Sequence, residues 1–230
     1  MPSPTGRALA AATEATPFAQ FARWFDEAQA AAGGSARAMT LSTVRLDGRP
    51  NARTVILASA DERGFVFGTD MTSVKATELL RPPHGASLTF NWPGPKHPSR
   101  NVRVDGVATP LSDADADAIF ARRPLKSKLG VHVGGQSEML ASCEAWHDRF
   151  EEVCQTHLGA GSSTVGTMPR EDAAAVTVPR PSHWCGFRVV PDRVEFWEEA
   201  PADAPPLHRR EVWSRPDLES PLWQTGELAP

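Results

Sequence analysis

The chain has 230 residues, of which 40% are hydrophobic and 23% charged, so it is long enough to bury a substantial core. Its net charge is −4 and no Lys/Arg cluster with interleaved aromatics is visible, which argues against nucleic acid as a partner. The sequence contains no apolar run of about 18 residues and no signal-peptide pattern, which predicts a cytoplasmic protein without membrane contact. The three cysteines lack the count of a disulfide framework and the spacing of zinc ligands, so we expect no metal site.

The composition of the chain changes at Pro17. Residues 1–16 are small, polar and rich in Pro and Ala, a composition that cannot offset the entropy of ordering, so they predict a flexible N-terminal arm. Residues 17–230 are predicted to form one domain. That domain opens with an amphipathic helix, which carries apolar side chains at helical spacing and ends at Gly33.

Short strands joined by tight turns follow this helix. Asp47-Gly48, between two alternating apolar segments, predicts a β-hairpin. The pattern is typical of an antiparallel sheet or barrel. The predicted strands cover residues 39–44, 52–57, 64–69, 86–92, 101–108, 184–190, 193–197 and about 209–213.

Helices are predicted between these strands. Ser73 is placed to cap the first of them, and the spacing of Ser112 and Asp115 is that of a capping box at the second. Residues 159–176 are rich in Gly, Ser, Thr and Ala and predict a mobile connector within the domain. The predicted helices cover residues 73–80, about 112–122 and about 137–159.

The segment between Thr69 and Lys75 carries the most informative local signal for a ligand. A strand ends there and a helix opens with the hydroxyl of Ser73 and the ammonium of Lys75. Free N–H groups and the positive end of the helix dipole favour an anion, so the pattern predicts a phosphate site. Arg53, on the adjoining strand, could close that site with two donors. The alternative is an ordinary serine cap beside a solvated lysine.

Nine short motifs follow one another between residues 39 and 230. They are Arg-Thr-Val-Ile-Leu at 53–57, Gly-Phe-Val-Phe-Gly-Thr-Asp at 64–70, Ser-Val-Lys-Ala at 73–76, Asn-Val-Arg-Val-Asp-Gly at 101–106, Arg-Arg-Pro at 122–124, Gly-Gln-Ser at 135–137, the Trp- and Phe-containing segment 181–197, Leu-His-Arg-Arg at 207–210 and a terminal Leu-Ala-Pro. Each motif is weak alone. In this order, they resemble the pyridoxine 5′-phosphate oxidase family.

The resemblance implies a fold and an assembly. The fold is mainly β with peripheral helices, and its centre is a six-stranded antiparallel split β-barrel that binds FMN. The implied assembly is a homodimer, with two FMN molecules at the interface between the subunits. The sequence is therefore expected to form an FMN-binding split barrel that works as a pair.

The resemblance also assigns residues to the cofactor. It implies that Gln136 and Ser137 reach the flavin from the facing subunit, although Ser137 could also be only a helix cap. Trp197 is expected to line the flavin, with a plain core residue as the alternative. The positions that match FMN phosphate contacts are Arg53, Thr69, Ser73 and Lys75. The remaining matches to FMN contacts are Thr54, Val55, Ile56, Asn101, Trp197 and Arg210.

Three positions near the expected cofactor depart from the family pattern. Gly68 stands where an aromatic residue is usual, Val74 replaces an Arg in the phosphate-binding turn, and Asn101 replaces a Gln near the flavin ring. The side chains that are lost correspond to about one charge-assisted hydrogen bond, or ~1.5–3 kcal/mol. We therefore expect weaker FMN binding than is usual in the family, but not its loss.

The expected substrate site departs further. The family places a Lys, a Tyr and an Arg at the positions of Ala58, Ile119 and Pro206, where they hold the substrate phosphate or its ring. Losing these groups predicts a wider and less cationic pocket, for which pyridoxine phosphate is a poor substrate. The matching positions that remain are Arg123, Ser127 and His208.

Two of the remaining residues are candidates for direct contact with the substrate. His208 is expected to orient the substrate or take a proton during hydride transfer, with a surface or interface histidine as the alternative. Arg123 is expected to hold a substrate carboxylate, and the alternative is an ion pair with Asp113 or Asp117.

The function that follows is an FMN-dependent oxidase or dehydrogenase. It would remove a hydride from a small cyclic intermediate of secondary metabolism, as oxidases of phenazine biosynthesis do, and dioxygen would reoxidise the flavin. One alternative is a divergent pyridoxine or pyridoxamine 5′-phosphate oxidase. Another is a split-barrel protein that binds flavin without catalysis.

Overall fold

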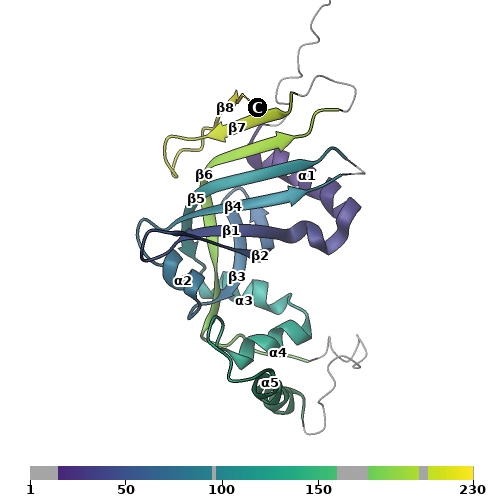
Figure 1. The fold of residues 1–230 in the computed structure, drawn as a ribbon, viewed down its shortest axis with the longest axis vertical. Coiled ribbons are helices and arrows are strands. Elements are labelled where there is room, and N and C mark those ends of the chain that lie inside the picture. The colour runs from purple at the N-terminus through teal and green to yellow at the C-terminus, as the bar shows by residue number, and fades with distance from the viewer. Residues whose placement is uncertain (1–14, 95–96, 160–175, 202–206, 230) are drawn as a thin grey trace, which may run out of the picture.

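The structure is a computed structural model that describes residues 15–94, 97–159, 176–201 and 207–229. It is mainly β, with helices at the periphery of one large sheet (Figure 1). Most of the predicted arm and connector lies outside the described residues, as does Pro206. Within the described ranges, no helix is long and apolar enough to cross a bilayer.

Six antiparallel strands close into a barrel. Hydrogen bonds connect the strands in the order β3-β2-β1-β4-β5-β6, and β3 also pairs with β6, which closes the ring. The predicted mainly β fold with a six-stranded antiparallel barrel is therefore confirmed. The strands are β1 (Ala38–Val44), β2 (Pro50–Asp61), β3 (Gly64–Asp70), β4 (Gly85–Trp92), β5 (Arg100–Pro110) and β6 (Trp184–Glu198).

The last barrel strand, β6, is long enough to pair with three neighbouring strands. Its first residues, 184–189, pair with β3, and its last residues, 193–198, pair with β7 (Arg209–Ser214). Most of its length also pairs with β5. The prediction of two separate strands here was wrong, because the chain passes Pro191 with only a shift in register. A further strand, β8 (Gln224–Glu227), extends the sheet and was not predicted.

The barrel interior is filled by the apolar residues that alternate along its strands. Leu41, Leu88, Phe90, Val102 and Phe196 are all essentially inaccessible to solvent. Each such side chain contributes ~1.5–3 kcal/mol through burial. Helix α1 (Pro17–Ala32) covers one side of the barrel with its apolar face, as predicted from its spacing.

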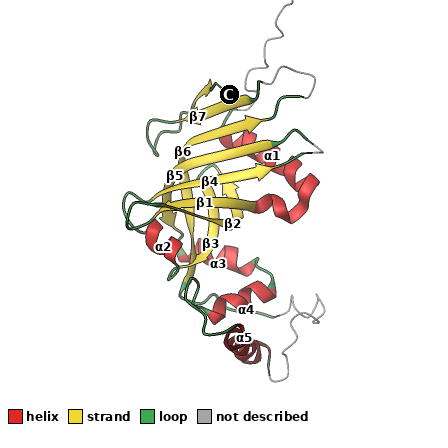
Figure 2. Cartoon of the chain, in the orientation of Figure 1, coloured by secondary structure: helices red, strands yellow, loops and turns green. Residues whose placement is uncertain are grey.

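The other helices lie around the barrel and below it (Figure 2). The prediction of a helix from residue 137 was wrong: Gly134, Gly135 and Ser137 have positive φ angles, and the helix begins only after Ser142. Helix α4 was missed because Gly130 weakens its pattern. The helices are α2 (Val74–Leu79), α3 (Asp113–Ala121), α4 (Leu125–Val133) and α5 (Cys143–Leu158), with a 3₁₀ turn at Gly33–Arg37.

Candidate functional site

The predicted phosphate-binding residues gather where β3 ends and α2 begins. The Lys75 ammonium donates to Thr69 Oγ1 at 3.2 Å and to Gln136 Oε1 at 2.8 Å. Lys75 is 9% exposed and Ser73 is fully buried. Ser73 occupies the N-cap position of α2 as predicted, but its side chain makes no capping hydrogen bond, because its hydroxyl donates to the carbonyl of Asp70 at 2.6 Å. The lysine is thus held at the centre of a small polar cluster.

The charge of Lys75 is poorly compensated in this position. Burial lowers the pKa of Lys75, and the nearby positive charge of Arg53 lowers it further. The carboxylates of Asp70 and Glu78 act in the opposite direction without outweighing these two effects. A bound anion would therefore stabilise the protonated lysine, which is the property required of a phosphate site.

Arg53 is engaged differently from the prediction. Its Nη2 donates to Glu78 Oε2 at 3.0 Å and its Nη1 donates to Thr43 Oγ1 at 2.6 Å. Asn51 donates to the other Glu78 oxygen at 2.9 Å. Because Glu78 neutralises the guanidinium, Arg53 is not the free cation that the sequence indicated, although it lies beside Lys75 closely enough to affect its pKa. Glu78 was not identified from the sequence.

Replacing Glu78 with Gln is expected to have two effects of opposite sign. Burial would raise the pKa of Glu78, but its hydrogen bonds and the charge of Arg53 outweigh burial and lower it. The carboxylate therefore stabilises the fold above its unfolded pKa of ~4.3, and that contribution is lost as the pH falls through the lower folded pKa. We expect the variant to lose ~1–3 kcal/mol of unfolding free energy at pH 7, and progressively less as the pH falls below the unfolded pKa of ~4.3.

The second effect concerns anions. Freeing Arg53 from Glu78 should tighten the binding of inorganic phosphate, measured by the shift that phosphate causes in the unfolding midpoint. Urea titrations at pH 7 and near pH 3.5 would check the first effect in the same preparation. A variant with unchanged stability at both pH values would contradict the role given to this ion pair.

A pocket of about 500 Å³ extends from this cluster between β2, β3, α3 and α4. Four cationic residues, Arg37, Lys75, Arg122 and Arg123, line it, and no carboxylate does so among the described residues. Arg37 and Arg122 were not assigned to this pocket from the sequence, so its lining carries more positive charge than the predicted residues alone supply. The predicted site residues in the lining are Thr54, Val55, Ile56, Ala58, Thr69, Lys75, Ile119, Arg123, Ser127 and Gln136.

Arg123 lies on one wall of the pocket, against an aromatic ring. Its guanidinium carbon lies 5.1 Å from the centre of the Trp184 ring, and its Nε is buried without a hydrogen-bond partner among the described residues. Burial lowers the pKa of Arg123. The alternative that it pairs with Asp113 or Asp117 was wrong, because both carboxylates bind Arg180. The sequence did not place Trp184 in this site.

The unusual glycine at position 68 is explained by Trp184. A Cβ atom at Gly68 would lie 2.3 Å from Cζ2 of the Trp184 ring, and the indole is 3% exposed. Gly68 therefore makes room for the ring on which Arg123 rests. The glycine thus shapes this wall of the pocket.

Replacing Gly68 with Ala is expected to displace the Trp184 ring and lower the unfolding free energy by ~1–3 kcal/mol. Guanidinium unfolding would measure the loss, and tryptophan fluorescence would report the ring movement. Gly85→Ala is the matched control, because a Cβ at that strand position meets nothing within 4 Å. Equal stability of the two variants would contradict the explanation.

A second group of predicted residues lies on the outer face of the sheet. Asn101, Trp197 and Arg210 occupy directly opposed positions on β5, β6 and β7. Both Nε and Nη2 of Arg210 donate to Glu195 Oε1, at 3.0 and 2.7 Å. These residues form one cross-strand row, and their assignment to the flavin stays a prediction.

His208 joins this row from the segment before β7. Its ring centre lies 4.9 Å from that of Trp197, and its Nδ1 accepts a hydrogen bond from the Ala200 amide at 3.2 Å. The neutral ring then carries its proton on Nε2 and presents a donor. This geometry favours orientation of a substrate over proton abstraction, which was the other role considered for His208.

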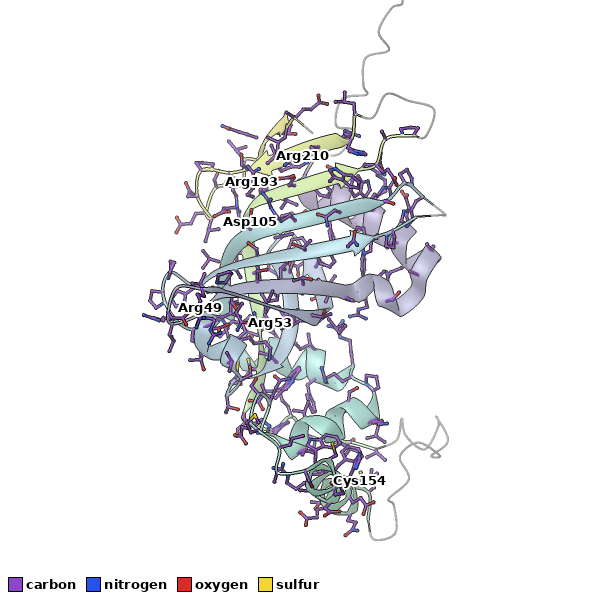
Figure 3. All side chains as sticks on the ribbon, in the orientation of Figure 1. Arg49, Arg53, Asp105, Cys154, Arg193 and Arg210 are labelled. Carbon is purple, nitrogen blue, oxygen red and sulfur yellow. The ribbon has the colours of Figure 1, made fainter. Side chains whose placement is uncertain are left out.

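Within one chain these two groups stay apart. Arg53 lies beside α2, whereas Arg210 lies on β7 with Arg193 and Asp105 nearby (Figure 3). The row on β5–β7 contributes nothing to the cationic pocket. Gln136 was expected to act from the facing subunit, but the structure places it against Lys75 of its own chain. Ser137 follows with a φ of 78° and caps no helix.

Comparison with known proteins agrees with this architecture. Residues 25–157 match the pyridoxamine 5′-phosphate oxidase family, and residues 184–230 match the pyridoxine 5′-phosphate oxidase C-terminal dimerisation region. The chain is 38% identical over 214 residues to a pyridoxine/pyridoxamine 5′-phosphate oxidase from Burkholderia vietnamiensis, covering 93% of this chain and 89% of that one. It is also 38% identical over 217 residues to the enzyme of that name from Gluconobacter oxydans, covering 94% and 96%.

Solved structures give the same result. The fold is similar to PhzG from Burkholderia lata 383 in complex with tetrahydrophenazine-1-carboxylic acid, with a TM-score of 0.76, 27% identity and 95% of each chain covered. An FMN-binding protein related to pyridoxamine 5′-phosphate oxidase, from Nostoc punctiforme, shares the fold with a TM-score of 0.68 at 18% identity, covering 94% of this chain and 100% of that one. Sequence and fold thus agree, and the chain belongs to the pyridoxamine 5′-phosphate oxidase family.

Proposed function

We propose that this protein is an FMN-dependent oxidase that removes a hydride from a small cyclic intermediate carrying an anionic group. The observation that carries the proposal is the pocket of about 500 Å³, which is lined by four cations and by no carboxylate of the described residues. When bound, FMN supplies the hydride acceptor, and dioxygen restores its oxidised form. The family, in which oxidoreductases are the rule, supports this chemistry.

The residues at the β3–α2 junction fit a phosphate group. Lys75 is buried, its pKa is lowered, and no carboxylate contacts it among the described residues, so it gains from an anion. Thr69 and Ser73 add hydroxyls, and the Gln136 amide can turn its N–H₂ end to the ligand. The backbone and side chains of Thr54, Val55 and Ile56 would form the wall along which the flavin ring lies, with Arg53 as a secondary charge.

A homodimer would bring the two groups of predicted residues together. The row formed by Asn101, Trp197 and Arg210 faces outward and lies away from the cationic pocket of its own chain. A second copy could present this row, with His208, to the pocket. The match of residues 184–230 to a dimerisation region supports this arrangement. We propose a cytoplasmic dimer with one site at each end of the interface.

The substrate would be held by its anionic group. Arg123, whose Nε has no hydrogen-bond partner among the described residues, lines the pocket together with Ser127, while Ile119 and Trp184 give an apolar surface for a ring. His208 of the second copy would donate a hydrogen bond from Nε2. A carboxylate suits a site with methyl and butyl side chains at Ala58 and Ile119, and the similarity to PhzG with its bound ring carboxylic acid supports that choice.

The test is an anaerobic reduction. Purified protein loaded with FMN is mixed with reduced phenazine carboxylic acids, and bleaching of the flavin absorbance is followed before air is admitted. Bleaching that air reverses is the expected result. Protein that takes up no FMN would contradict the proposal at its first step.

The names of the most similar relatives favour a second candidate, a divergent pyridoxine or pyridoxamine 5′-phosphate oxidase. The cationic lining is also compatible with a phosphorylated substrate. Turnover of pyridoxine 5′-phosphate in the same assay would establish it. Bound flavin that neither class of compound reduces would instead favour a non-catalytic flavin-binding protein.

A further inference from the structure

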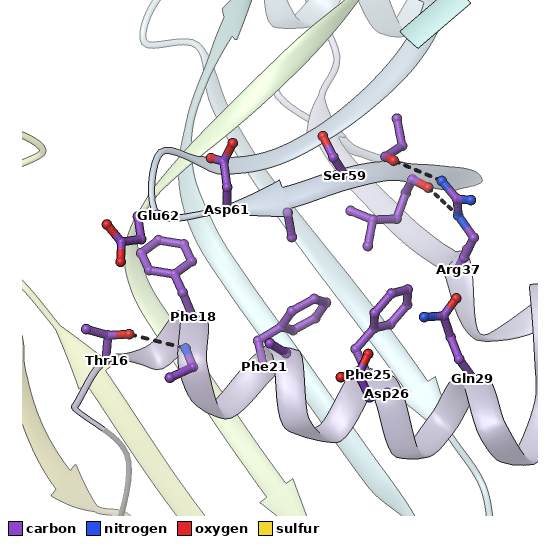
Figure 4. Close-up of a pocket in the computed structure, with 15 residues that line it drawn as sticks. Thr16, Phe18, Phe21, Phe25, Asp26, Gln29, Arg37, Ser59, Asp61 and Glu62 are labelled. Atoms are coloured by element: carbon purple, nitrogen blue, oxygen red, sulfur yellow. Dashed lines mark hydrogen bonds between the residues drawn. The ribbon is translucent and has the colours of Figure 1, made fainter. Parts of the chain in front are cut away.

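Arg37 makes an unusual contact at the edge of the pocket. Its Nε donates to the carbonyl of Leu57 at 2.8 Å and its Nη2 donates to the carbonyl of Ala58 at 2.9 Å (Figure 4). The pairing of β2 with β3 changes register between Leu57 and Ser59. Arg37 therefore binds two consecutive backbone carbonyls of β2 at the point where that strand is irregular.

The position of Arg37 is fixed by its neighbours. Ala36 is buried, and its carbonyl accepts a hydrogen bond from the Trp92 indole at 2.9 Å. On the other side, Ala38 begins β1 and pairs with Ile56. The backbone is thus anchored on both sides of Arg37, and two of its nitrogen atoms are already bound. Little side-chain freedom remains to be lost when a ligand arrives.

Arg37 borders two cavities at once. One is the cationic pocket of about 500 Å³, and the other is a groove of about 580 Å³ between α1 and β2, with Phe18, Phe21 and Phe25 on its helix side (Figure 4). Arg37, Leu57 and Ala58 line both. Because the side chain of Ala58 is a single methyl group, it cannot screen the guanidinium from the pocket.

No carboxylate forms an ion pair with Arg37 among the described residues, although Asp26, Asp61 and Glu62 line the groove on its other side. Its contacts within the described residues are the two backbone carbonyls, which leaves both N–H groups of Nη1 without an acceptor there. Arginines elsewhere in the structure, such as Arg180, Arg188 and Arg210, are paired with Asp or Glu. The pocket arginines differ from them in offering an unneutralised charge.

We propose that Arg37 is a specificity-determining residue that recognises the anionic group of the substrate together with Arg123. Its two carbonyl contacts hold the guanidinium plane, and Nη1 binds the anion from the side where Ala58 leaves space. The inference rests on the proposed function, because it assumes that a substrate enters the cationic pocket. Arg37 lies outside all nine sequence motifs that carry the family resemblance.

The test compares an anion with its neutral counterpart. Phenazine-1-carboxylic acid and phenazine-1-carboxamide are titrated calorimetrically into the FMN-loaded protein, and pyridoxine 5′-phosphate and pyridoxine form a second pair. Wild-type protein should prefer the anion in at least one pair. In Arg37→Gln that preference should fall about tenfold or more, because a charge-assisted contact is lost while the neutral ligand keeps its affinity. Arg37→Lys should retain much of the preference, and FMN content should not change.

Arg81→Gln is the matched control. Arg81 also lacks a carboxylate partner among the described residues, but it is exposed at the end of α2 and borders neither cavity. An Arg37→Gln variant that binds anion and amide more weakly by the same factor would overturn the proposal, since Arg37 would then only support β2. Unchanged binding of both would overturn it too. If wild-type protein takes up no FMN, the proposed function fails, and the same titrations on flavin-free protein still decide the role of Arg37.

Discussion

Replacing Gly186 with Ala is expected to lower the unfolding free energy by about 3 kcal/mol or more. Gly186 lies on β6 opposite Gly68, at the seam where β6 closes the barrel against β3. A Cβ there would lie 2.4 Å from the carbonyl oxygen of Phe67 and 3.1 Å from Leu111 Cδ1. A backbone carbonyl cannot rotate away as a side chain can, so the two strands would have to separate. Urea unfolding followed by circular dichroism would measure the loss.

Gly226→Ala serves as the control for this substitution. Gly226 also lies in a strand, β8, but a Cβ there meets nothing within 4 Å. We expect that variant to unfold within ~0.5 kcal/mol of the wild type. If Gly186→Ala were equally well tolerated, the close approach of β3 and β6 would not be needed for barrel closure.

Replacing Lys75 with Met is expected to weaken FMN binding about 10- to 100-fold, since one charge-assisted contact to the phosphate is worth ~1.5–3 kcal/mol. The pH dependence is the more specific test. Because the pKa of Lys75 is lowered, the affinity of the wild type should fall as the pH rises through a value below the usual ~10.4 of lysine. The variant has no such group, and its affinity should stay level over that range.

Fluorescence quenching of FMN at a series of pH values would supply both measurements. Lys126→Met is a suitable control, because Lys126 is exposed on α4 and does not border the pocket. Its affinity and pH profile should match those of the wild type. FMN affinity within twofold of wild type in Lys75→Met would place the phosphate elsewhere.

Much of the barrel could be predicted because its strands are encoded locally. The alternation along β1, β4 and β5 marks their inner faces, and Asp47-Gly48 forms the expected turn, with Gly48 at a φ of 81°. The hairpin register follows from that turn. By contrast, the pairing of β3 with β6 joins residues more than a hundred positions apart. No local pattern encodes that contact, so the sequence pointed to it only through the family resemblance.

The site likewise contains residues that local sequence predicts and residues whose role depends on the fold. Thr69, Ser73 and Lys75 are close in the sequence, and their grouping was predicted from it. Glu78 was missed because an acid in a short helix usually faces water, and only the fold turns it towards Arg53. Arg37 was missed for a similar reason, since its role depends on the irregular strand β2 beside it. The cofactor and substrate roles of these residues stay predictions.

Because β6 pairs with β3, β5 and β7 and lies late in the chain, the barrel can close only late in synthesis. β3 has one partner, β2, in the first part of the chain and receives its second only when residues 184–189 are available. A nascent chain that ends before that point carries an open sheet, and the β3 edge that includes Phe65 and Phe67 is unpaired. Such an edge is a template for pairing with other chains. We therefore expect truncated or stalled products to aggregate, and the full chain to become resistant to protease only after residues 184–189 have left the ribosome.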